Sequence, residues 1–322
     1  MQRYVIMDVD TGVDDAIAII AALHNYSDRL IGVTTVAGNT SSQQAALNTL
    51  FLLRQFSLVK PIPVHTGTER TLRGVSPSLI PQIHGSDGLG GVSHRYWATR
   101  SNPVMKTGAV EYLLDIASRF TDALSILATG PLTNIAQAIQ QAPEIMGRIG
   151  RLFIMGGAVD RPGNITPYAE FNAYTDPEAF SVVLSSHLPI TLFPLNVTEQ
   201  VWMLASSLEG QLAPQVQKAR LIRDITSRYC QFHLETLGFN GWFLHDVLPV
   251  VALGRPDLFQ YESISLDIEV NDTKQRGRLC RRDKHNQPIS VASRIKAREA
   301  IGTIWTTLQQ RDPATLYTTL AS

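Results

Sequence analysis

The sequence predicts an α/β protein with a mostly parallel, Rossmann-like open sheet flanked by helices and a helical cap over the carboxyl ends of the strands. Apolar runs of strand length alternate with longer segments of helical periodicity, as is typical of parallel sheets covered by helices. Polar residues gather directly after the apolar runs, where ligands bind in such sheets. Because no linker or repeat divides the chain, residues 1–322 are expected to form a single domain.

The first unit of this pattern lies at the N-terminus. Residues 4–9 are expected to form a strand and residues 10–12 a turn. Residues 14–24 are expected to form a helix with Ile17 and Leu23 on its inner face. The chain therefore begins with a strand, a turn and a helix.

Later segments continue the alternation. Pro131 suits the first turn of the helix after the strand at residues 124–128. Residues 201 to about 230 carry little strand signal, so they are expected to be helical and to form the cap. The other elements expected are strands at residues 30–36, 152–155, 190–194 and 263–270 and a helix at about residues 41–56.

Composition and charge exclude several classes of protein. Hydrophobic residues make up 44% and charged residues 17%, as in globular proteins. Lys plus Arg (28) balances Asp plus Glu (28), so no basic field would hold nucleic acid or an anionic membrane. No apolar run reaches the ~20 residues of a membrane span, and no signal peptide is evident, so a cytoplasmic location is expected. Cys230 and Cys280 suit reduced thiols, with a disulfide as the alternative.

Four aspartates stand within eight residues at the end of the first expected strand. Alternation places Asp8 and Asp10 on one side of the strand end, while Asp14 and Asp15 open the next helix. These carboxylates repel one another unless a cation lies among them, and oxygen ligands favour Ca²⁺ or Mg²⁺ over Zn²⁺. For Asp14 or Asp15 alone, helix capping is the simpler interpretation, and Asp8 could be only a hydrogen-bond acceptor. The four together indicate a cation site.

One alternative interpretation of this segment is a phosphatase. Asp8-Val9-Asp10-Thr11 loosely fits the Asp-x-Asp-x-Thr motif of haloacid-dehalogenase-like phosphatases, where it supplies a nucleophile and a general acid. That mechanism needs a later metal motif beginning Gly-Asp. The sequence contains no Gly-Asp pair.

A closer resemblance covers nearly the whole chain. The segment from Asp8 to Ala16 resembles the signature of nucleoside hydrolases, Asp-x-Asp-x-Gly-x-Asp-Asp-Ala, although Thr11 stands where many members have proline. The resemblance extends from residue 4 to about residue 310. Further matches follow in the family's order: Val36-Ala-Gly-Asn39, Ala128-Thr-Gly-Pro-Leu-Thr-Asn134, Met155-Gly-Gly157, Gly163-Asn164, Glu170-Phe-Asn172, Asp176-Pro-Glu-Ala179 and His245-Asp246.

The resemblance implies calcium-dependent hydrolysis of the N-glycosidic bond of ribonucleosides to free base and ribose. By that analogy Ca²⁺ is held by the side chains of Asp10, Asp15 and Asp246 and by the backbone carbonyl of Thr129. Ca²⁺ accepts about six to eight oxygens, which leaves room for a water and the two hydroxyls of a ribose. A small-molecule nucleoside is therefore the expected partner.

The same analogy assigns ribose recognition to amide and carboxylate side chains. Asn39 would otherwise be a turn residue chosen for its geometry. Met155 could pack under the sugar or simply fill the core. The ribose-binding residues implied are Asp14, Asn39, Asn164, Glu170 and Asn172, with Met155 beside them.

Catalysis requires an activated water and assistance to the leaving base, because the sugar passes through an oxocarbenium-like state. Asp10 is the expected general base, acting on a water held at the cation. His245 is the leading candidate to protonate the base and His84 the second; each could instead be a packed histidine. His245-Asp246 resembles the inosine-uridine-preferring and pyrimidine-preferring branches, which predicts a pyrimidine or broad substrate range.

Four expectations concern the rest of the molecule. Residues 229–242, with Phe232, His233, Phe239 and Trp242, are expected to supply part of the base pocket. Residues 276–284 carry several basic side chains and are expected to form the solvated face of a hairpin. Asn134 is expected to stabilise the turn in which it lies. The resemblance also implies a homodimer or homotetramer acting in purine and pyrimidine salvage. A riboside-binding protein without turnover remains the alternative from a different functional class.

Overall fold

The computed structural model describes residues 3–55, 60–93, 106–212, 216–282 and 286–310. A nine-stranded sheet forms the centre, in the order β10-β13-β7-β6-β5-β1-β2-β3-β4. All neighbouring strands are parallel except the edge pair β10 and β13, so the mostly parallel sheet is confirmed. The strands are β1 (Tyr4–Val9), β2 (Leu30–Thr35), β3 (Val64–Thr66), β4 (Lys106–Thr107), β5 (Leu124–Ala128), β6 (Arg151–Met155), β7 (Ile190–Phe193), β10 (Phe259–Ile264) and β13 (Ile289–Ile295).

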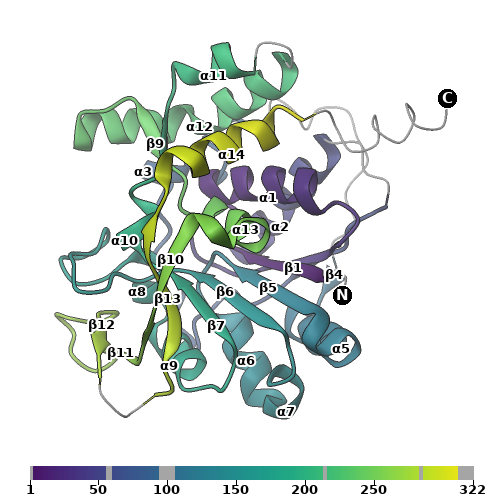
Figure 1. The fold of residues 1–322 in the computed structure, drawn as a ribbon, viewed down its shortest axis with the longest axis vertical. Coiled ribbons are helices and arrows are strands. Elements are labelled where there is room, and N and C mark those ends of the chain that lie inside the picture. Colours follow the sequence, from purple (N-terminus) through teal and green to yellow (C-terminus); the bar gives the residue numbers. More distant parts are fainter. Residues whose placement is uncertain (1–2, 56–59, 94–105, 213–215, 283–285, 311–322) are drawn as a thin grey trace.

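Helices cover both faces of the sheet (Figure 1). Side chains alternate along β1, so Val5, Met7 and Val9 join one hydrophobic cluster while Ile6 joins the other. Burial on both sides explains why the parallel strands read as nearly continuous apolar runs. One face carries α1 (Val13–Tyr26), α2 (Ser42–Gln55), α13 (Val247–Gly254) and α14 (Ala297–Leu308), and the other carries α5 (Ala109–Phe120), α6 (Thr133–Gln141), α7 (Pro143–Met146) and α9 (Pro177–Leu184).

The cap contains strands as well as the expected helices. In Figure 1, α11 (Ser207–Gln211) and α12 (Val216–Leu237) lie beyond the layer of α1 and α14. Strands β8 (Trp202–Leu204) and β9 (Gly241–Phe243), which come before and after these helices in the chain, pair in a two-stranded antiparallel sheet. The helical prediction for residues 201–230 was thus wrong at its start, where Met203 is buried between exposed neighbours with the period of a strand.

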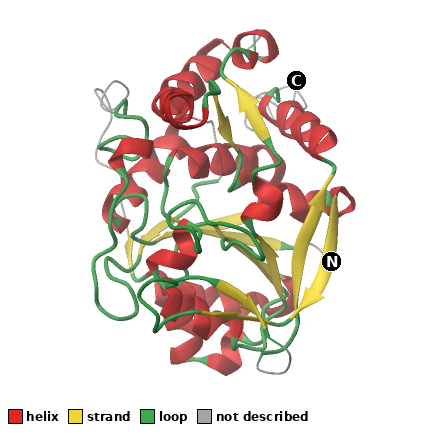
Figure 2. Cartoon of the chain, turned by 90° about the vertical axis from the view of Figure 1, so that its left-hand side faces the viewer, coloured by secondary structure: helices red, strands yellow, loops and turns green. Residues whose placement is uncertain are grey.

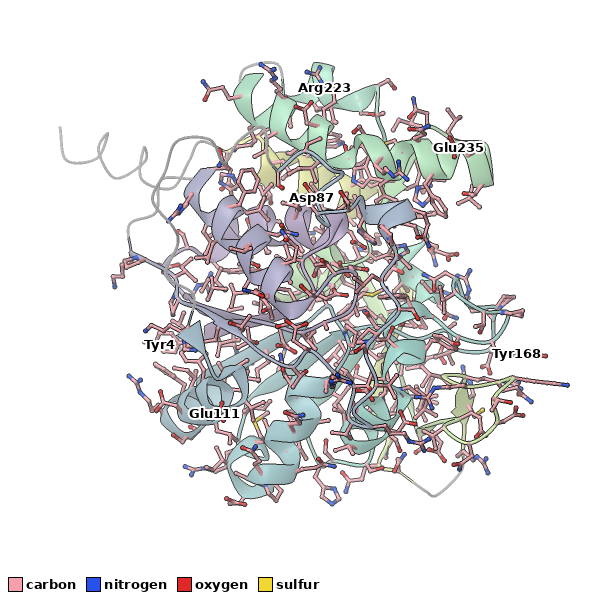
Figure 3. All side chains as sticks on the ribbon, turned by 180° about the vertical axis from the view of Figure 1, so that it is seen from behind. Tyr4, Asp87, Glu111, Tyr168, Arg223 and Glu235 are labelled. Atoms are coloured by element: carbon pink, nitrogen blue, oxygen red, sulfur yellow. The ribbon has the colours of Figure 1, made fainter. Side chains whose placement is uncertain are left out.

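A loop below the cap is held together by one aspartate. Asp87 Oδ1 accepts hydrogen bonds from the backbone N–H of Leu89 (2.8 Å) and Gly91 (2.7 Å), and Oδ2 accepts one from Ser93 (2.8 Å). Figure 3 shows Asp87 beneath α12, on which Arg223 is labelled. The loop follows α3 (Pro81–His84), which packs against α12. This contact places α3 between the cap and the sheet.

The last third of the chain departs from the expected single strand at residues 263–270. The chain leaves the sheet after β10 and forms β11 (Leu266–Ile268), which pairs with β12 (Leu279–Arg281) in a separate hairpin (Figure 2). An apolar run does not show where a strand changes partner, because pairing depends on tertiary contacts. The short elements α8 (Phe171–Thr175) and α10 (Leu195–Thr198) and two 3₁₀ turns, Thr121–Ala123 and Pro256–Leu258, complete the described structure.

Two expectations about local turns were also wrong. Pro131 precedes α6, which begins at Thr133, instead of lying in its first turn. Asn134 links distant segments rather than its own turn. Its Nδ2 donates to Asp8 Oδ1 (2.8 Å) and to the Thr35 carbonyl (2.9 Å), while its Oδ1 accepts from the Thr68 N–H (3.1 Å). Asn134 therefore joins β1, β2 and the loop after β3.

Several surface expectations have mixed outcomes. Cys230 and Cys280 are free thiols, as expected. Arg278, Arg281 and Arg282 are exposed, as expected of a solvated face. Arg276 is instead half-buried and donates to both carboxylate oxygens of Glu178 (2.6 and 2.7 Å). Lys284 lies outside the described residues. Within the described part of the chain, every helix is too short or too polar to cross a membrane.

Candidate active site

A cavity at the carboxyl ends of the central strands brings together residues from the whole length of the chain. Every site residue expected from the sequence lines it except Asp10 and Asp15. Five apolar or aromatic residues that the motifs did not indicate complete its wall. The lining residues are Asp14, Asn39, Ile80, Ile83, His84, Thr129, Met155, Asn164, Ile165, Glu170, Phe171, Asn172, Tyr229, His245 and Asp246.

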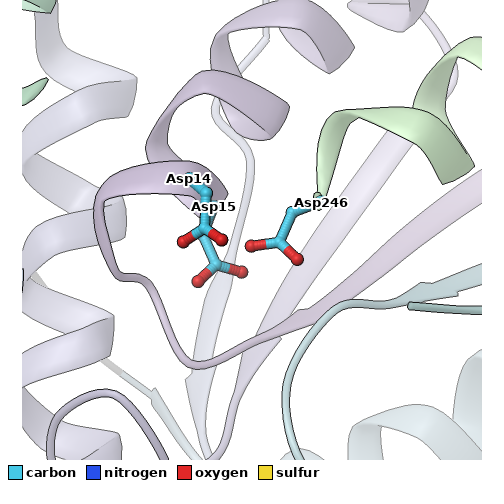
Figure 4. A group of neighbouring side chains, drawn as sticks. All are labelled: Asp14, Asp15 and Asp246. Carbon is cyan, nitrogen blue, oxygen red and sulfur yellow. The ribbon is translucent and has the colours of Figure 1, made fainter. Parts of the chain in front are cut away.

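Three buried aspartates meet at the base of this cavity. Asp14, Asp15 and Asp246 each offer a carboxylate oxygen, and these oxygens lie within 4.8 Å of one another (Figure 4). Asp14 and Asp15 open α1, and Asp246 is the N-cap residue of α13. Because α1 packs against α13, carboxylates more than two hundred positions apart in the sequence become neighbours.

Hydrogen bonds hold Asp15 and Asp10 in place. Asp15 Oδ1 accepts from the Thr129 hydroxyl (2.6 Å), and Oδ2 accepts from the Gly12 N–H (2.9 Å). Asp10 Oδ2 accepts from the Asn39 N–H (2.7 Å). In the described part of the chain, Asp10 Oδ1 has no hydrogen-bond partner although it is buried. One oxygen of Asp10 is thus fixed and the other is free for chemistry.

Burial and mutual repulsion make ionisation of this group costly. Burial raises the pKa of Asp14 from 3.8 to about 7, with a further rise from the Asp15 carboxylate. Burial also raises the pKa of Asp10, Asp15 and Asp246, and neighbouring carboxylates add to the rise for Asp10 and Asp246. Like Asp10 Oδ1, Asp14 Oδ1 is buried without a hydrogen-bond partner among the described residues. Unpaired oxygens in a cluster of carboxylates fit a divalent cation, so this group could bind a metal ion.

Asp8, the one aspartate of the N-terminal motif that lies within β1, differs from Asp10, Asp14 and Asp15. Its Oδ1 accepts from the Thr34 hydroxyl (2.5 Å) and from Asn134 Nδ2 (2.8 Å), so it joins neighbouring parts of the sheet. Burial raises its pKa to about 7. Asp8 does not line the cavity, which fits its expected role as a hydrogen-bond acceptor.

Amide and carboxylate side chains form the opposite wall. Glu170 caps α8, where its Oε1 accepts from the Asn172 N–H (2.9 Å) and its Oε2 from the Gly157 N–H (2.7 Å). Asn172 Nδ2 donates to the Thr129 carbonyl (2.7 Å). Asn164 Oδ1 accepts from the Phe171 N–H (3.0 Å). These bonds fix the polar groups before any ligand enters, as a specific site requires.

Two buried histidines face the cavity. His84 Nδ1 accepts from the Val13 N–H (3.0 Å), so the proton of a neutral His84 ring lies on Nε2. His245 Nδ1 forms a hydrogen bond with the Thr198 hydroxyl (2.8 Å). Burial lowers the pKa of each imidazole to about 3. Both rings are therefore neutral at physiological pH in the protein without ligands.

Of the aromatic residues expected at the base pocket, only Tyr229 lines the cavity. Its ring lies 5.7 Å from the ring of His84 and 4.4 Å from that of His233. Trp242 is fully buried in the core, and His233 Nδ1 is hydrogen-bonded to the Gly241 carbonyl (2.9 Å). Only Tyr229 of this segment is therefore placed to contact a base, because the rings of Phe232, His233, Phe239 and Phe243 pack against one another within the cap.

Two glycines in the recognised motifs are required by close packing. A Cβ atom at Gly12 would lie 2.6 Å from both Asn39 Nδ2 and His84 Nδ1. A Cβ atom at Gly38 would lie 2.1 Å from Asp10 Oδ2. Any larger residue at either position would displace a side chain of the site.

Comparison with known proteins identifies the class to which this fold and cavity belong. The family model "Inosine-uridine preferring nucleoside hydrolase" matches residues 5–302. The chain is 35% identical to "Uridine nucleosidase 1" of Arabidopsis thaliana over 264 residues, which cover 82% of this chain and 77% of that protein. It is 30% identical to "Pyrimidine-specific ribonucleoside hydrolase RihB" of Escherichia coli (strain SE11) over 277 residues, 86% of each.

A solved structure agrees with this assignment. The "Purine-Preferring Ribonucleoside Hydrolase from Gardnerella vaginalis" matches with a TM-score of 0.87 and 28% identity, covering 95% of this chain and 98% of that one. The chain belongs to the nucleoside hydrolase family. It is a ribonucleoside N-glycosidase, an enzyme that hydrolyses the bond between ribose and base. The expected family and reaction class are confirmed.

The buried carboxylates predict that a divalent cation stabilises the protein. Adding Ca²⁺ at about a hundred times its dissociation constant should raise the free energy of unfolding by about 2–3 kcal/mol. The measurement is the melting temperature of chelator-treated protein before and after Ca²⁺. Asp246→Asn should lose most of the shift, whereas Asp28→Asn on the surface should keep it; no shift in the wild type would contradict a cation site.

The rise in melting temperature on adding Ca²⁺ should also depend on pH. The pKa of Asp14 is about 7 in the cation-free fold and 3.8 in the unfolded chain. Protonation of Asp14 therefore stabilises the fold below about pH 7, and this stabilisation is lost as the pH rises through about 7. A cation must displace that proton. The melting shift should therefore be larger at about pH 8 than at about pH 6.5, where His84 and His245 remain neutral. Equal shifts at both pH values would show that the proton and the cation do not compete.

Proposed function

We propose that this ribonucleoside hydrolase uses Ca²⁺, held by the side chains of Asp10, Asp15 and Asp246 and by the carbonyl of Thr129. The observation that carries the proposal is the buried cluster of Asp14, Asp15 and Asp246, whose carboxylate oxygens lie within 4.8 Å of one another beside a cavity lined by amides and histidines. Asp10 is proposed as a ligand because its carboxylate contacts that of Asp15, while Asp14 is left to face the ribose. The donors are all oxygens, which suits a hard cation. Bound there, the ion would keep the carboxylates ionised and orient a water and the ribose hydroxyls.

The ribose is proposed to lie between the carboxylates and the amide wall. Asp14 and Asn39 face the cavity from the side of α1, and Asn164, Glu170 and Asn172 face it from the side of α8. Together they can accept and donate the hydrogen bonds that sugar hydroxyls need. Met155 also lines the cavity and would pack against the sugar.

Asp10 is the proposed general base. Its Oδ2 is held by the Asn39 N–H, whereas its Oδ1 is buried without a hydrogen-bond partner in the described structure. The free oxygen is therefore the one that would accept a proton from the attacking water. Breaking of the C1′–N bond then leaves positive charge on the sugar and negative charge on the base.

His245 is proposed to protonate the departing base, with His84 as the second candidate. Both rings face the cavity, and Tyr229 lies beside His84. Each imidazole is neutral in the protein without ligands because burial lowers its pKa to about 3. Negative charge developing on the base would favour a protonated imidazole beside it, which is when a proton donor is needed.

Asp10→Asn tests the assignment of the base. The amide cannot accept the proton of water, so kcat for uridine should fall by at least about a hundredfold. Release of free uracil and ribose measures the rate. Asp28→Asn, an exposed substitution in the turn after α1, serves as the matched control. Cleavage by purified Asp10→Asn at the wild-type rate would show that Asp10 is not the base.

A second experiment separates leaving-group protonation from other roles of the histidines. p-Nitrophenyl riboside releases an anion that is stable without a proton. His245→Ala should therefore lower the rate on uridine by about a hundredfold or more while changing the rate on p-nitrophenyl riboside by less than about tenfold. The same comparison of the two substrates with His84→Ala decides which of the two histidines protonates the leaving base. Equal losses on both substrates would mean that the histidine positions the sugar or the cation site instead.

We propose a preference for pyrimidine nucleosides or a broad inosine and uridine range. The names of two relatives, a uridine nucleosidase and a pyrimidine-specific hydrolase, support this range, although a structural neighbour is named as purine-preferring. The adjacent pair His245 and Asp246 adds support from the sequence. Values of kcat/KM for uridine, cytidine, inosine and adenosine test it. Cleavage of the two purine nucleosides alone would overturn this assignment.

The setting in which the enzyme works is proposed from the resemblance alone. Residues 1–322 would form one domain, copies of the chain would assemble into a homodimer or homotetramer, and the enzyme would act in the cytoplasm in purine and pyrimidine salvage.

A further inference from the structure

A second cavity adjoins the active site. The two share Ile80, Ile165 and Phe171 as a common wall. The second cavity is otherwise lined by the loop that precedes α3, by the end of α8 and by the β11–β12 hairpin. Among its described lining residues, the only charged ones are Arg73 and Arg276. It is thus a cavity with an apolar entrance and two cationic groups.

The two arginines share one carboxylate. Arg276 donates to both oxygens of Glu178 (2.6 and 2.7 Å), and Arg73 Nε lies 2.8 Å from Glu178 Oε1. The terminal nitrogens of Arg73 have no protein partner in the described structure, and its side chain is 54% exposed. Because two guanidinium groups share one carboxylate, one positive charge is not neutralised. The terminal N–H groups of Arg73 remain available to donate to a ligand, and a guanidinium edge of this kind commonly binds phosphate.

The position of Arg73 is set by its turn. The Thr71 N–H donates to the Val75 carbonyl (2.8 Å), and the Gly74 N–H donates to the Thr71 carbonyl (2.7 Å). Gly74 has a φ of +79°, which a residue with a side chain rarely adopts. The neighbouring Leu72 N–H donates to Asp176 (2.7 Å), which joins the turn to α9. The loop is therefore held in place without a ligand.

The proposed orientation of the substrate, on which this inference rests, directs one end of the ribose toward this cavity. The diol lies at the carboxylates and the base at His84 and His245. In this orientation the C5′ carbon would point toward the part of the lining that includes Asn164 and Phe171. Phe171 also lines the second cavity, so a substituent on C5′ would extend into it.

We propose that the second cavity binds an anionic substituent on C5′, with a phosphate monoester as the simplest case. The enzyme then also hydrolyses ribonucleoside 5′-monophosphates. The C1′–N bond breaks, water adds a hydroxyl to C1′, and the other proton of that water ends on the leaving base. The phosphate ester stays intact, so the products are free base and ribose 5-phosphate.

The first test compares uridine with uridine 5′-monophosphate as substrates of the Ca²⁺-loaded enzyme. We expect uracil from both, and ribose 5-phosphate from the nucleotide without inorganic phosphate. Release of phosphate before uracil would assign the reaction to a phosphatase and overturn the proposal. If uridine is cleaved but the nucleotide is neither cleaved nor inhibitory, this inference alone fails. If uridine itself is not cleaved, the proposed function fails.

Substitution of Arg73 supplies the second test. Arg73→Gln removes the charge from an exposed side chain that does not line the active site, so kcat/KM for uridine 5′-monophosphate should fall by about tenfold or more while that for uridine stays within about twofold. Arg119→Gln, an exposed arginine on α5 paired with Asp115, is the matched control and should change neither. Equal losses on both substrates with Arg73→Gln would overturn the proposal.

Product binding gives a readout that needs no turnover. Ribose 5-phosphate should inhibit uridine hydrolysis at a lower concentration than ribose in the wild type, and Arg73→Gln should remove most of the difference. A neutral 5′-deoxy-5′-alkylthio uridine should be unaffected by Arg73→Gln, since it lacks the anion. If ribose and its 5-phosphate inhibit equally in the wild type, the second cavity does not bind the phosphate.

Discussion

The crowding of carboxylates at the end of β1 is the constraint on which the rest of the structure depends. Asp14, Asp15 and Asp246 place oxygens within 4.8 Å of one another in a buried position, and Asp10 lies against Asp15. Burial raises the pKa of each group, which means that the ionised cluster is unfavourable without a positive charge. A cation among these oxygens would offset this penalty, so the cluster is a site that could bind a metal ion.

The surrounding structure serves to keep these oxygens in place. The Gly12 N–H, the Asn39 N–H and the Thr129 hydroxyl each donate to a carboxylate of the cluster from a different loop at the same edge of the sheet. Parallel strands bring those loops together because their carboxyl ends share one edge. The close approach of side chains around Gly12 and Gly38 explains why glycine stands at these positions.

The cap and the β11–β12 hairpin bring further side chains to the cavities next to the carboxylates. Tyr229 reaches the cavity from α12, while His84 comes from α3, which packs against that helix. On the other side, the β11–β12 hairpin and the loop before α3 bring Arg276 and Arg73 to a single carboxylate, Glu178. His84 thus lies beside the carboxylates, with its Nδ1 4.0 Å from Asp14 Oδ1, whereas the two arginines proposed to bind a substituent on C5′ line a separate, adjoining cavity.

The sequence by itself determined the fold class, most strands and a site for a hard cation, because apolar period, turn residues and ligand type are local properties. The reaction class came from the resemblance of its motifs to those of nucleoside hydrolases. The sequence predicted β1 and β5 at both ends, and it marked Asp14 and Asp15 as part of a carboxylate cluster; Asp246, which the structure places beside them, was indicated only by the resemblance. Only the tertiary structure decided that β8 opens the cap, that Asn134 joins separate strands, and that Tyr229 alone of its segment faces the cavity. These features depend on how distant elements pack, for which a single sequence carries no local signal.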